Sequence, residues 1–184
     1  PFAAVSLHDN MVRGVYEDRN HKLWVGTDGG VVHIFDEQRL TVEKIELHAG
    51  GKKRVAPFYF MDFDQNILLI GTSEGMLQYD RRTKRISYFP PLEKYTKGVQ
   101  VRQMVVHNGV LFYTTFGALK SFNLSTGEFR SYNDRKAEEK VINATTLYVD
   151  RLNRLWVGVS NGISVYDPAA DRFKRFVFRK TDSR

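Results

Sequence analysis

The chain has 184 residues, 42% of them hydrophobic and 27% charged, which is ordinary for a soluble globular protein. It contains no cysteine, which excludes disulfides, thiolate nucleophiles and cysteine-ligated zinc. The net charge of +7 comes from basic clusters between apolar segments, a pattern typical of a solvated rim, so we predict no nucleic acid partner. No apolar run approaches about 18 residues, so we predict no membrane contact. The start, "PFAAVSLHDN", has neither an initiator Met nor a leader, and we expect it to lie inside a longer protein.

Four short strands are predicted in the first part of the chain. An apolar strand, "GVYED", ends at Asp18 and is followed by a polar turn and by "LWVGT", residues 23 to 27. A glycine turn then leads to "VVHIFD", and the alternating stretch "TVEKIEL" closes the unit. The segments are short and bounded by turn residues, and no helical periodicity is present, so we predict antiparallel strands.

The same pattern recurs three times further along the chain. The first strands of these copies end at Asp64, His107 and Asp150, and the second strands read "LLIGT", "LFYTT" and "LWVGV". The leading leucines, Leu23, Leu68, Leu111 and Leu155, lie 45, 43 and 44 residues apart. A four-stranded antiparallel unit of about 44 residues, evenly repeated, is the sequence form of a β-propeller blade. We therefore predict an all-β fold, a single β-propeller segment over residues 1–184 with four blades of four antiparallel strands at residues 8–49, 54–92, 98–134 and 141–178.

A Gly-x-Ser-x-Gly motif, "GTSEG" at residues 71 to 75, is typical of the serine-hydrolase nucleophile elbow. However, it occupies the same place in its repeat as "GTDGG", "TTFG" and "GVSNG", and no helix follows it. We predict a turn between the second and third strands, so Ser73 is not a nucleophile. The turn glycines should supply positive φ angles; they are Gly30, Gly75, Gly117 and Gly162.

A second motif, "DFDQN", places Asp62, Asp64 and Asn66 as in the start of a calcium loop. It lacks the glycine and the closing glutamate of that loop, and the other repeats carry plain turns here. The five histidines are scattered and show no helical i, i+4 pairing. We therefore predict no catalytic residue, no metal site and no cofactor.

Trp24 and Trp156 allow two interpretations. Flat aromatic rings complement sugar faces, yet both residues occupy one position of the second strand, where the other repeats have Leu69 and Phe112. A large apolar residue at a fixed register is typical of a core between blades. We predict that role for both tryptophans.

The stretch "VRGVYEDRNHKLWVGTDGGVVHIFD", echoed by "TTLYVDRLNRLWVGVSNGISVYDP", resembles the two-component regulator propeller repeat. In that family the unit reads roughly Val-Arg-x-Ile-x-x-Asp, a turn, Leu-Trp-Ile-Gly-Thr, Gly-Leu and aromatic-Asp. The second copy lacks the Trp, and the third has Thr114 for the glycine and Asn123 for the Asp. WD-type and kelch patterns do not fit, because no Gly-His precedes the strands and only one repeat carries a Gly-Gly pair.

The resemblance implies a periplasmic sensor region of a hybrid two-component system, as in gut Bacteroidetes. There, propellers and a further β-domain precede a membrane helix, a histidine kinase and a response regulator, and the receptors commonly sense oligosaccharides to control polysaccharide-utilisation genes. It implies for this chain a non-enzymatic, ligand-sensing segment. Its partners would be an oligosaccharide and the remaining propeller and sensor domains of the parent protein.

The family's propellers are usually seven-bladed, so four blades would expose two apolar blade faces, which soluble proteins rarely tolerate. We therefore expect a homodimer through the exposed blade faces, with an eight-bladed ring as the hypothesis.

Propellers gather residues of different blades at the mouth of the central channel. Arg13, Tyr59, Arg102 and Thr145 each stand five residues before the Asp or His that ends a first strand. Arginine and tyrosine can hold a sugar carboxylate or hydroxyls. A plain channel lining is the alternative, because arginine is common at this place in the family.

Two other functions stay open from the sequence. One is a propeller lyase of the streptogramin type, which would need a histidine and an acid, such as His107 and Asp64, to converge with a metal. The other is a non-catalytic platform that binds a protein and no small molecule.

Overall fold

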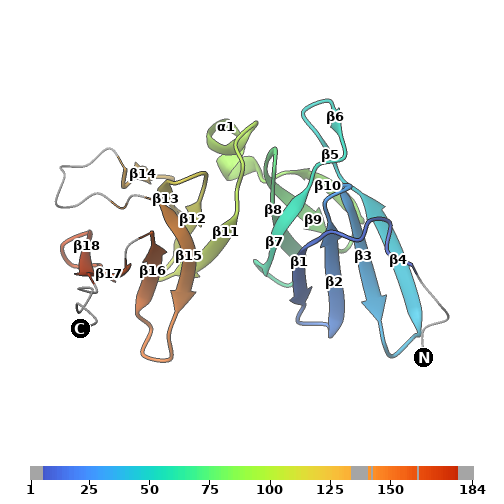
Figure 1. Ribbon diagram of the computed structural model, residues 1–184, viewed down its shortest axis with the longest axis horizontal. Coiled ribbons are helices and arrows are strands. Elements are labelled where there is room, and N and C mark those ends of the chain that lie inside the picture. The colour runs from blue at the N-terminus through green and yellow to red at the C-terminus, as the bar shows by residue number, and fades with distance from the viewer. Residues whose placement is uncertain (1–5, 134–140, 142, 161, 178–184) are drawn as a thin grey trace, which may run out of the picture. The chain divides into compact units, whose positions relative to one another are not determined.

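The computed structural model describes residues 6–133, 141, 143–160 and 162–177 and shows an all-β chain (Figure 1). It forms two compact units, Pro1–Arg102 and Gln103–Arg184. Unit one holds sheet one, β1 (Val12–Glu17), β2 (Lys22–Thr27), β3 (Val31–Asp36) and β4 (Thr41–Glu46), and sheet two, β7 (Pro57–Asp62), β8 (Ile67–Thr72), β9 (Gly75–Asp80) and β10 (Arg85–Tyr88). Both sheets are antiparallel meanders, in which each strand pairs with the next along the chain.

Unit two repeats this arrangement. Sheet three contains β11 (Gln103–His107), β12 (Val110–Thr114), β13 (Leu119–Asn123) and β14 (Phe129–Ser131). Sheet four contains β15 (Ala144–Val149), β16 (Leu155–Val159), β17 (Gly162–Asp167) and β18 (Arg172–Val177). The prediction of four four-stranded antiparallel repeats thus corresponds to four sheets of the structure.

The structure also contains elements that the repeat pattern does not predict. A two-stranded sheet, β5 (His48–Ala49) and β6 (Lys52–Lys53), follows sheet one, and a short helical segment, η1 (Pro90–Leu92) and α1 (Glu93–Thr96), follows sheet two. The residues that the structure describes therefore form five sheets, the fifth of them in a connection. These connections bury apolar side chains: Leu47 and Leu92 are fully buried and Val55 is 1% exposed. Within the described ranges, no helix is long and apolar enough to cross a membrane.

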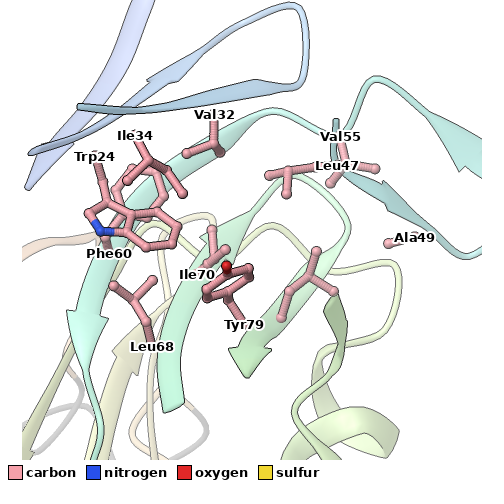
Figure 2. Close-up of a cluster of buried hydrophobic side chains, with 11 residues drawn as sticks. Trp24, Val32, Ile34, Leu47, Ala49, Val55, Phe60, Leu68, Ile70 and Tyr79 are labelled. Carbon is pink, nitrogen blue, oxygen red and sulfur yellow. The ribbon is translucent and has the colours of Figure 1, made fainter. Parts of the chain in front are cut away.

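The core of unit one lies between sheets one and two, as Figure 2 shows. Trp24 is 2% exposed and lies 5.1 Å from the ring of Tyr79 and 6.0 Å from that of Phe60, measured between ring centroids. Val32 and Ile34 of β3 pack in the same cluster. Each such side chain contributes about 1.5–3 kcal/mol by leaving water. The prediction that Trp24 belongs to the core between repeats is confirmed.

The core of unit two is more aromatic. The rings of Tyr132 and Phe173 lie 5.0 Å apart in an edge-to-face arrangement, and Phe112 lies 5.1 Å from Tyr166. Trp156, by contrast, is only half-buried and lies 6.1 Å from Phe176 in its own sheet. Trp156 is thus placed in the same register as Trp24 but is not enclosed like it.

An aspartate at the end of the first strand organises the next hairpin in the first and fourth repeats. The Asp18 carboxylate accepts the N–H of Asn20 at 2.9 Å and of Lys22 at 3.0 Å, and the Trp24 indole N–H at 3.0 Å. Asp150 makes the same three kinds of contact, with Trp156 at 2.8 Å. The Asp and the Trp therefore form one structural unit, which explains why the two residue types recur together.

The predicted turn glycines adopt positive φ angles. Gly30 has φ 78° and Gly117 has φ 74°. A Cβ atom at Gly30 would lie 2.4 Å from the Cα of Arg54, so this turn excludes every larger residue.

Candidate ligand-binding site

Three of the four sheets begin with a β-bulge in their first strand. The pairing of β1 with β2, of β7 with β8 and of β15 with β16 shifts register at the second residue of the first strand. The extra residues are Arg13, Phe58 and Thr145. A bulge redirects a side chain out of the regular alternation of the strand. Arg13 and Thr145, both predicted from the sequence, therefore occupy one repeated place in their sheets.

Tyr59 lies one residue further along its strand than the other predicted positions. In sheet one the hairpin between the first two strands is closed by a hydrogen bond from the Asp18 N–H to the Lys22 carbonyl. In sheet two the equivalent hydrogen bond runs from the Phe63 N–H to the Ile67 carbonyl, at 3.0 Å. Phe63, and not Asp64, therefore corresponds to Asp18. The residue that matches Arg13 in sheet two is Phe58, which the sequence reasoning missed.

Phe58 can be found from the sequence if the count starts at the leading leucine. Arg13 lies ten positions before Leu23, and the same interval leads from Leu68 back to Phe58, whereas from Leu111, which follows a shorter hairpin, it leads to Val101 and not to Arg102. The aspartate was a misleading reference, because Asp62 and Asp64 flank Phe63. Tyr59 itself is half-buried, and burial raises the pKa of its hydroxyl above the ordinary range.

Arg102 lies directly before β11, and its guanidinium carbon lies 5.8 Å from the centre of the Phe58 ring. Its Nε donates to the Gln100 side-chain oxygen at 3.2 Å. The stacked pair brings a cation and an aromatic face together at the start of a first strand.

Arg13 is bound to the turn that follows the second strand of its own sheet. Its Nε donates to Asp28 Oδ1 at 2.7 Å, and the two side chains are 40% and 42% exposed. Both charges therefore remain accessible to a ligand. Thr145, in the second unit, is exposed and donates to the Gly158 carbonyl at 3.3 Å.

Two cavities of the described residues lie away from these strand starts, between the paired sheets. In unit one a cavity of about 540 Å³ is lined by Trp24, Tyr79 and Arg81, among others. Arg81 donates to Asp18 at 3.3 Å and also to Asp62, so it joins the carboxylates of the two sheets. Burial alone would raise the pKa of Asp62, but the hydrogen bonds from Arg81 and from the Arg19 N–H hold it below its ordinary range.

Unit two has a smaller cavity of about 220 Å³ at the corresponding place. Asp171 accepts hydrogen bonds there from the Tyr132 hydroxyl at 2.9 Å and the Tyr166 hydroxyl at 2.8 Å, and it pairs with Arg130. Burial, followed by the hydrogen bond to Asp171, raises the pKa of Tyr166 far above its ordinary range. These polar groups satisfy one another across sheets three and four, which indicates a structural role.

Both enzyme-like motifs lie in turns. The Ser73 side chain accepts the Ala56 N–H at 3.2 Å, and Ser73 precedes β9, so the predicted turn is confirmed. Asp64 accepts the N–H groups of Asn66 at 2.7 Å and Ile67 at 2.8 Å, as a turn-forming aspartate does. In the part of the chain that the structure describes, no three His, Asp or Glu side chains gather as metal ligands.

Comparison with known proteins supports the resemblance found in the sequence. Residues 6–29 match the family model of the two component regulator propeller. The predicted resemblance to this repeat is thus confirmed for these residues. Among curated proteins, none is detectably similar to the chain in sequence.

Solved structures share the fold. The extracellular domains assigned to the hybrid two component systems BT4673 and BT3049 of B. thetaiotaomicron are 18% and 20% identical, with TM-scores of 0.77 and 0.76 over 98% of this chain. The WD40 beta propeller domain of Doa1 is 12% identical, with a TM-score of 0.63 over 91% of this chain. The chain spans about a quarter, 23% and 24%, of the two extracellular domains and 53% of the Doa1 domain. The fold is therefore an all-β fold similar to part of a β-propeller.

Proposed function

We propose, from the two-component regulator propeller repeat at residues 6–29, that the chain is a ligand-sensing propeller segment of a hybrid two-component sensor. Its four four-stranded sheets are consecutive blades of a single propeller segment, 1–184, at residues 8–49, 54–92, 98–134 and 141–178. The similarity in fold to two extracellular sensor domains supports this assignment. The segment is periplasmic, in the extracytoplasmic part of an inner-membrane protein, and its direct partners are the remaining propeller and sensor domains.

The proposed ligand is an oligosaccharide, bound where the first strands begin. The observation that carries this proposal is the guanidinium of Arg102 stacked on Phe58, in the same place of the repeat as the exposed Arg13. An aromatic face complements a sugar ring, and arginine binds carboxylates and hydroxyls. Tyr59 and Thr145 complete the predicted set. The chain itself contributes no catalytic residue, and the ligand controls polysaccharide-utilisation genes through the rest of the receptor.

Calorimetric titration of the chain with neutral and uronic-acid oligosaccharides tests the proposal. We expect saturable binding of a member of the panel, and a fall in affinity on the order of tenfold for Arg102→Ala or Phe58→Ala. Arg85→Ala is the matched control, because Arg85 is an exposed arginine on the outer strand β10. Equal losses in Arg85→Ala and Arg102→Ala, or binding unchanged by all three substitutions, would refute the site.

A protein-binding platform is the second candidate, favoured by one observation. Phe116, in the turn between β12 and β13, is 84% exposed, which is unusual for an aromatic side chain. If this function holds, Phe116→Ala weakens binding of a receptor segment while oligosaccharides show no saturable binding. A pull-down with the purified remaining receptor domains measures this binding. An unchanged yield for Phe116→Ala would count against the protein-binding function.

A further inference from the structure

The cavities between the paired sheets lie at the same place in the two units but differ in size. The cavity of unit one has about 540 Å³ and that of unit two about 220 Å³. Sites for small molecules usually have about 300–1,000 Å³, so the first of these two cavities falls in that range and the second does not. We call the larger one the unit-one cavity.

In unit two, the protein fills this place with a ring and an acid of its own. The Tyr132 ring is stacked on Phe112, with the ring centroids 6.2 Å apart. The Asp171 carboxylate accepts the hydroxyls of Tyr132 at 2.9 Å and Tyr166 at 2.8 Å, and it pairs with Arg130. The polar groups of this cavity thus bind one another and leave little free space.

Unit one lacks both the ring and the acid. Ile45 stands at the register position of Tyr132, because the strand pairs β3–β4 and β13–β14 have the same register. Lys84 stands at the position of Asp171, since each directly precedes the first residue of the last strand of its sheet. An isoleucine therefore replaces the aromatic ring, and a cation replaces the carboxylate.

The tyrosine that would bind this carboxylate is nevertheless present in unit one. Tyr79 pairs with Ile86 as Tyr166 pairs with Phe173, so the two tyrosines are equivalent. Tyr79 lines the unit-one cavity and is 4% exposed. Among the residues that the structure describes, none accepts a hydrogen bond from its hydroxyl. Burial raises the pKa of Tyr79, so the hydroxyl stays a donor at neutral pH and an acceptor inside the cavity would satisfy it.

The charges around the unit-one cavity favour an acidic ligand. Lys22 and Arg39 share one carboxylate, that of Asp36, at 3.5 Å and 3.8 Å. Lys84 and Glu43 form a balanced pair at 3.1 Å. The remaining charges of the lining, on the buried arginine and its aspartate, are closed by hydrogen bonds within the protein. One positive charge at the rim of the cavity is therefore left without a carboxylate.

We propose that the unit-one cavity binds a small aromatic carboxylic acid, which supplies the ring and the carboxylate that the protein itself supplies in unit two. The ligand carboxylate accepts the hydrogen bond of the Tyr79 hydroxyl, and Lys22 and Arg39 offset its charge. The ligand ring packs against Trp24, which lines the cavity and takes the place of Phe112. The site lies apart from the strand starts, so it goes beyond the oligosaccharide binding proposed above.

Titration of the complete 184-residue chain with benzoate at low salt tests this proposal, followed by NMR on the indole N–H signals of the two tryptophans. We expect a saturable shift of the Trp24 signal with a Kd on the order of 1 mM, as for other small fragments. Trp156 lies in unit two, outside both cavities, and its signal should not move. Benzamide has nearly the same shape without the charge, and it should bind about tenfold more weakly or less.

Tyr79→Phe should weaken benzoate binding on the order of tenfold, because it removes the donor to the carboxylate. Tyr166→Phe is the matched control: it removes the same hydroxyl from unit two and should leave the affinity for benzoate unchanged. Arg102→Ala should also leave it unchanged, because Arg102 belongs to the proposed oligosaccharide site. The two sites can therefore be tested, and can fail, independently of each other.

A triple variant should close the unit-one cavity by rebuilding the arrangement of unit two. It combines Glu43→Arg, Ile45→Tyr and Lys84→Asp, and it should lose benzoate binding while circular dichroism shows that the fold is kept. The proposal is overturned if the Trp24 signal shows no saturable shift up to about 20 mM benzoate. It is also overturned if benzamide binds as tightly as benzoate, or if Tyr79→Phe or the folded triple variant binds benzoate as the wild type does.

Discussion

The paired Asp and Trp of the first and fourth repeats show how single residues define the repeat. Asp18 is 3% exposed, and its carboxylate serves two backbone N–H groups, the Trp24 indole and Arg81. In sheet three, His107 and Phe112 take the corresponding places, with ring centroids 6.4 Å apart. Sheets one, three and four thus have a contact between these two positions, which is a hydrogen bond in sheets one and four and a contact between rings in sheet three.

Replacing Asp18 should strongly destabilise unit one. Asp18→Ala removes the acceptor from buried donors, which costs about 2 kcal/mol or more of unfolding free energy, measured by urea unfolding. Trp24→Phe keeps the ring but removes the indole N–H. In a double-mutant cycle, the loss of unfolding free energy in the double variant should be about 1 kcal/mol smaller than the sum of the losses in the two single variants.

Asp64→Ala is the matched control for this cycle, because Asp64 is exposed and contacts only local turn N–H groups. It should cost clearly less than Asp18→Ala and show no coupling to Trp24→Phe. Strict additivity between Asp18→Ala and Trp24→Phe would contradict the role given to the indole hydrogen bond.

His33 is a buried titratable residue on β3. It is fully buried, its Nε2 accepts the His8 N–H at 3.2 Å, and burial lowers its pKa below the ordinary value of about 6.5. The unfolded chain therefore binds the proton more readily than the folded chain. The stability that the neutral ring contributes is present above about pH 6.5 and is lost as the pH falls toward the lower folded pKa.

His33→Leu should remove this part of the pH dependence. Leucine is the replacement of choice, because Leu77 pairs with Ile70 in sheet two as His33 pairs with Val25 in sheet one. Thermal unfolding between pH 8 and pH 5.5 should show a smaller loss of midpoint for His33→Leu than for the wild type. His48 is exposed, so His48→Gln should lose as much of its midpoint as the wild type does. If the midpoint of His33→Leu depends on pH as strongly as that of the wild type, His33 is not the cause.

An ion pair that joins two neighbouring sheets occurs in both units, with the positive and negative residues exchanged. Glu43 of β4 binds Lys84 of the turn before β10 at 3.1 Å in unit one. At the corresponding register positions in unit two, Arg130 of β14 binds Asp171 of the turn before β18. Neighbouring sheets are therefore joined at this place by opposite charges, whichever sheet carries the cation.

Exchanging the charges in unit one should be tolerated, because unit two already has that arrangement. Lys84→Glu alone sets two carboxylates against each other and should cost about 0.2–1 kcal/mol, a small value because both side chains are largely exposed. Glu43→Lys with Lys84→Glu should recover most of that loss in urea unfolding at low salt. Failure to recover it would show that the pair does not join the sheets.

The sequence predicts the repeated strands well because their signals are local. The glycine turns and the alternation of each strand lie within a repeat, and the leading leucine recurs at nearly the same spacing from one repeat to the next. Elements between repeats carry no such period: β5, β6 and α1 are ordered by burial of Leu47, Val55 and Leu92 against the sheets. The predicted equivalence of Tyr59 to Arg13 fails for a related reason, because register in sheet two is set by the bond from Phe63 to Ile67 and not by the nearest aspartate.

For the whole molecule, the repeat, the fold and the bulged strand starts together support a sensor segment. The strand starts concern its ligand.

The most direct test of the sensor assignment is to map oligosaccharide binding on the chain by backbone amide NMR shifts. The account predicts saturable shifts centred on Arg13, Phe58 and Arg102, with the amides that line the cavity of unit two, such as Asp171, unchanged. Saturable shifts confined to that cavity, or the absence of saturable shifts across the whole oligosaccharide panel, would contradict it.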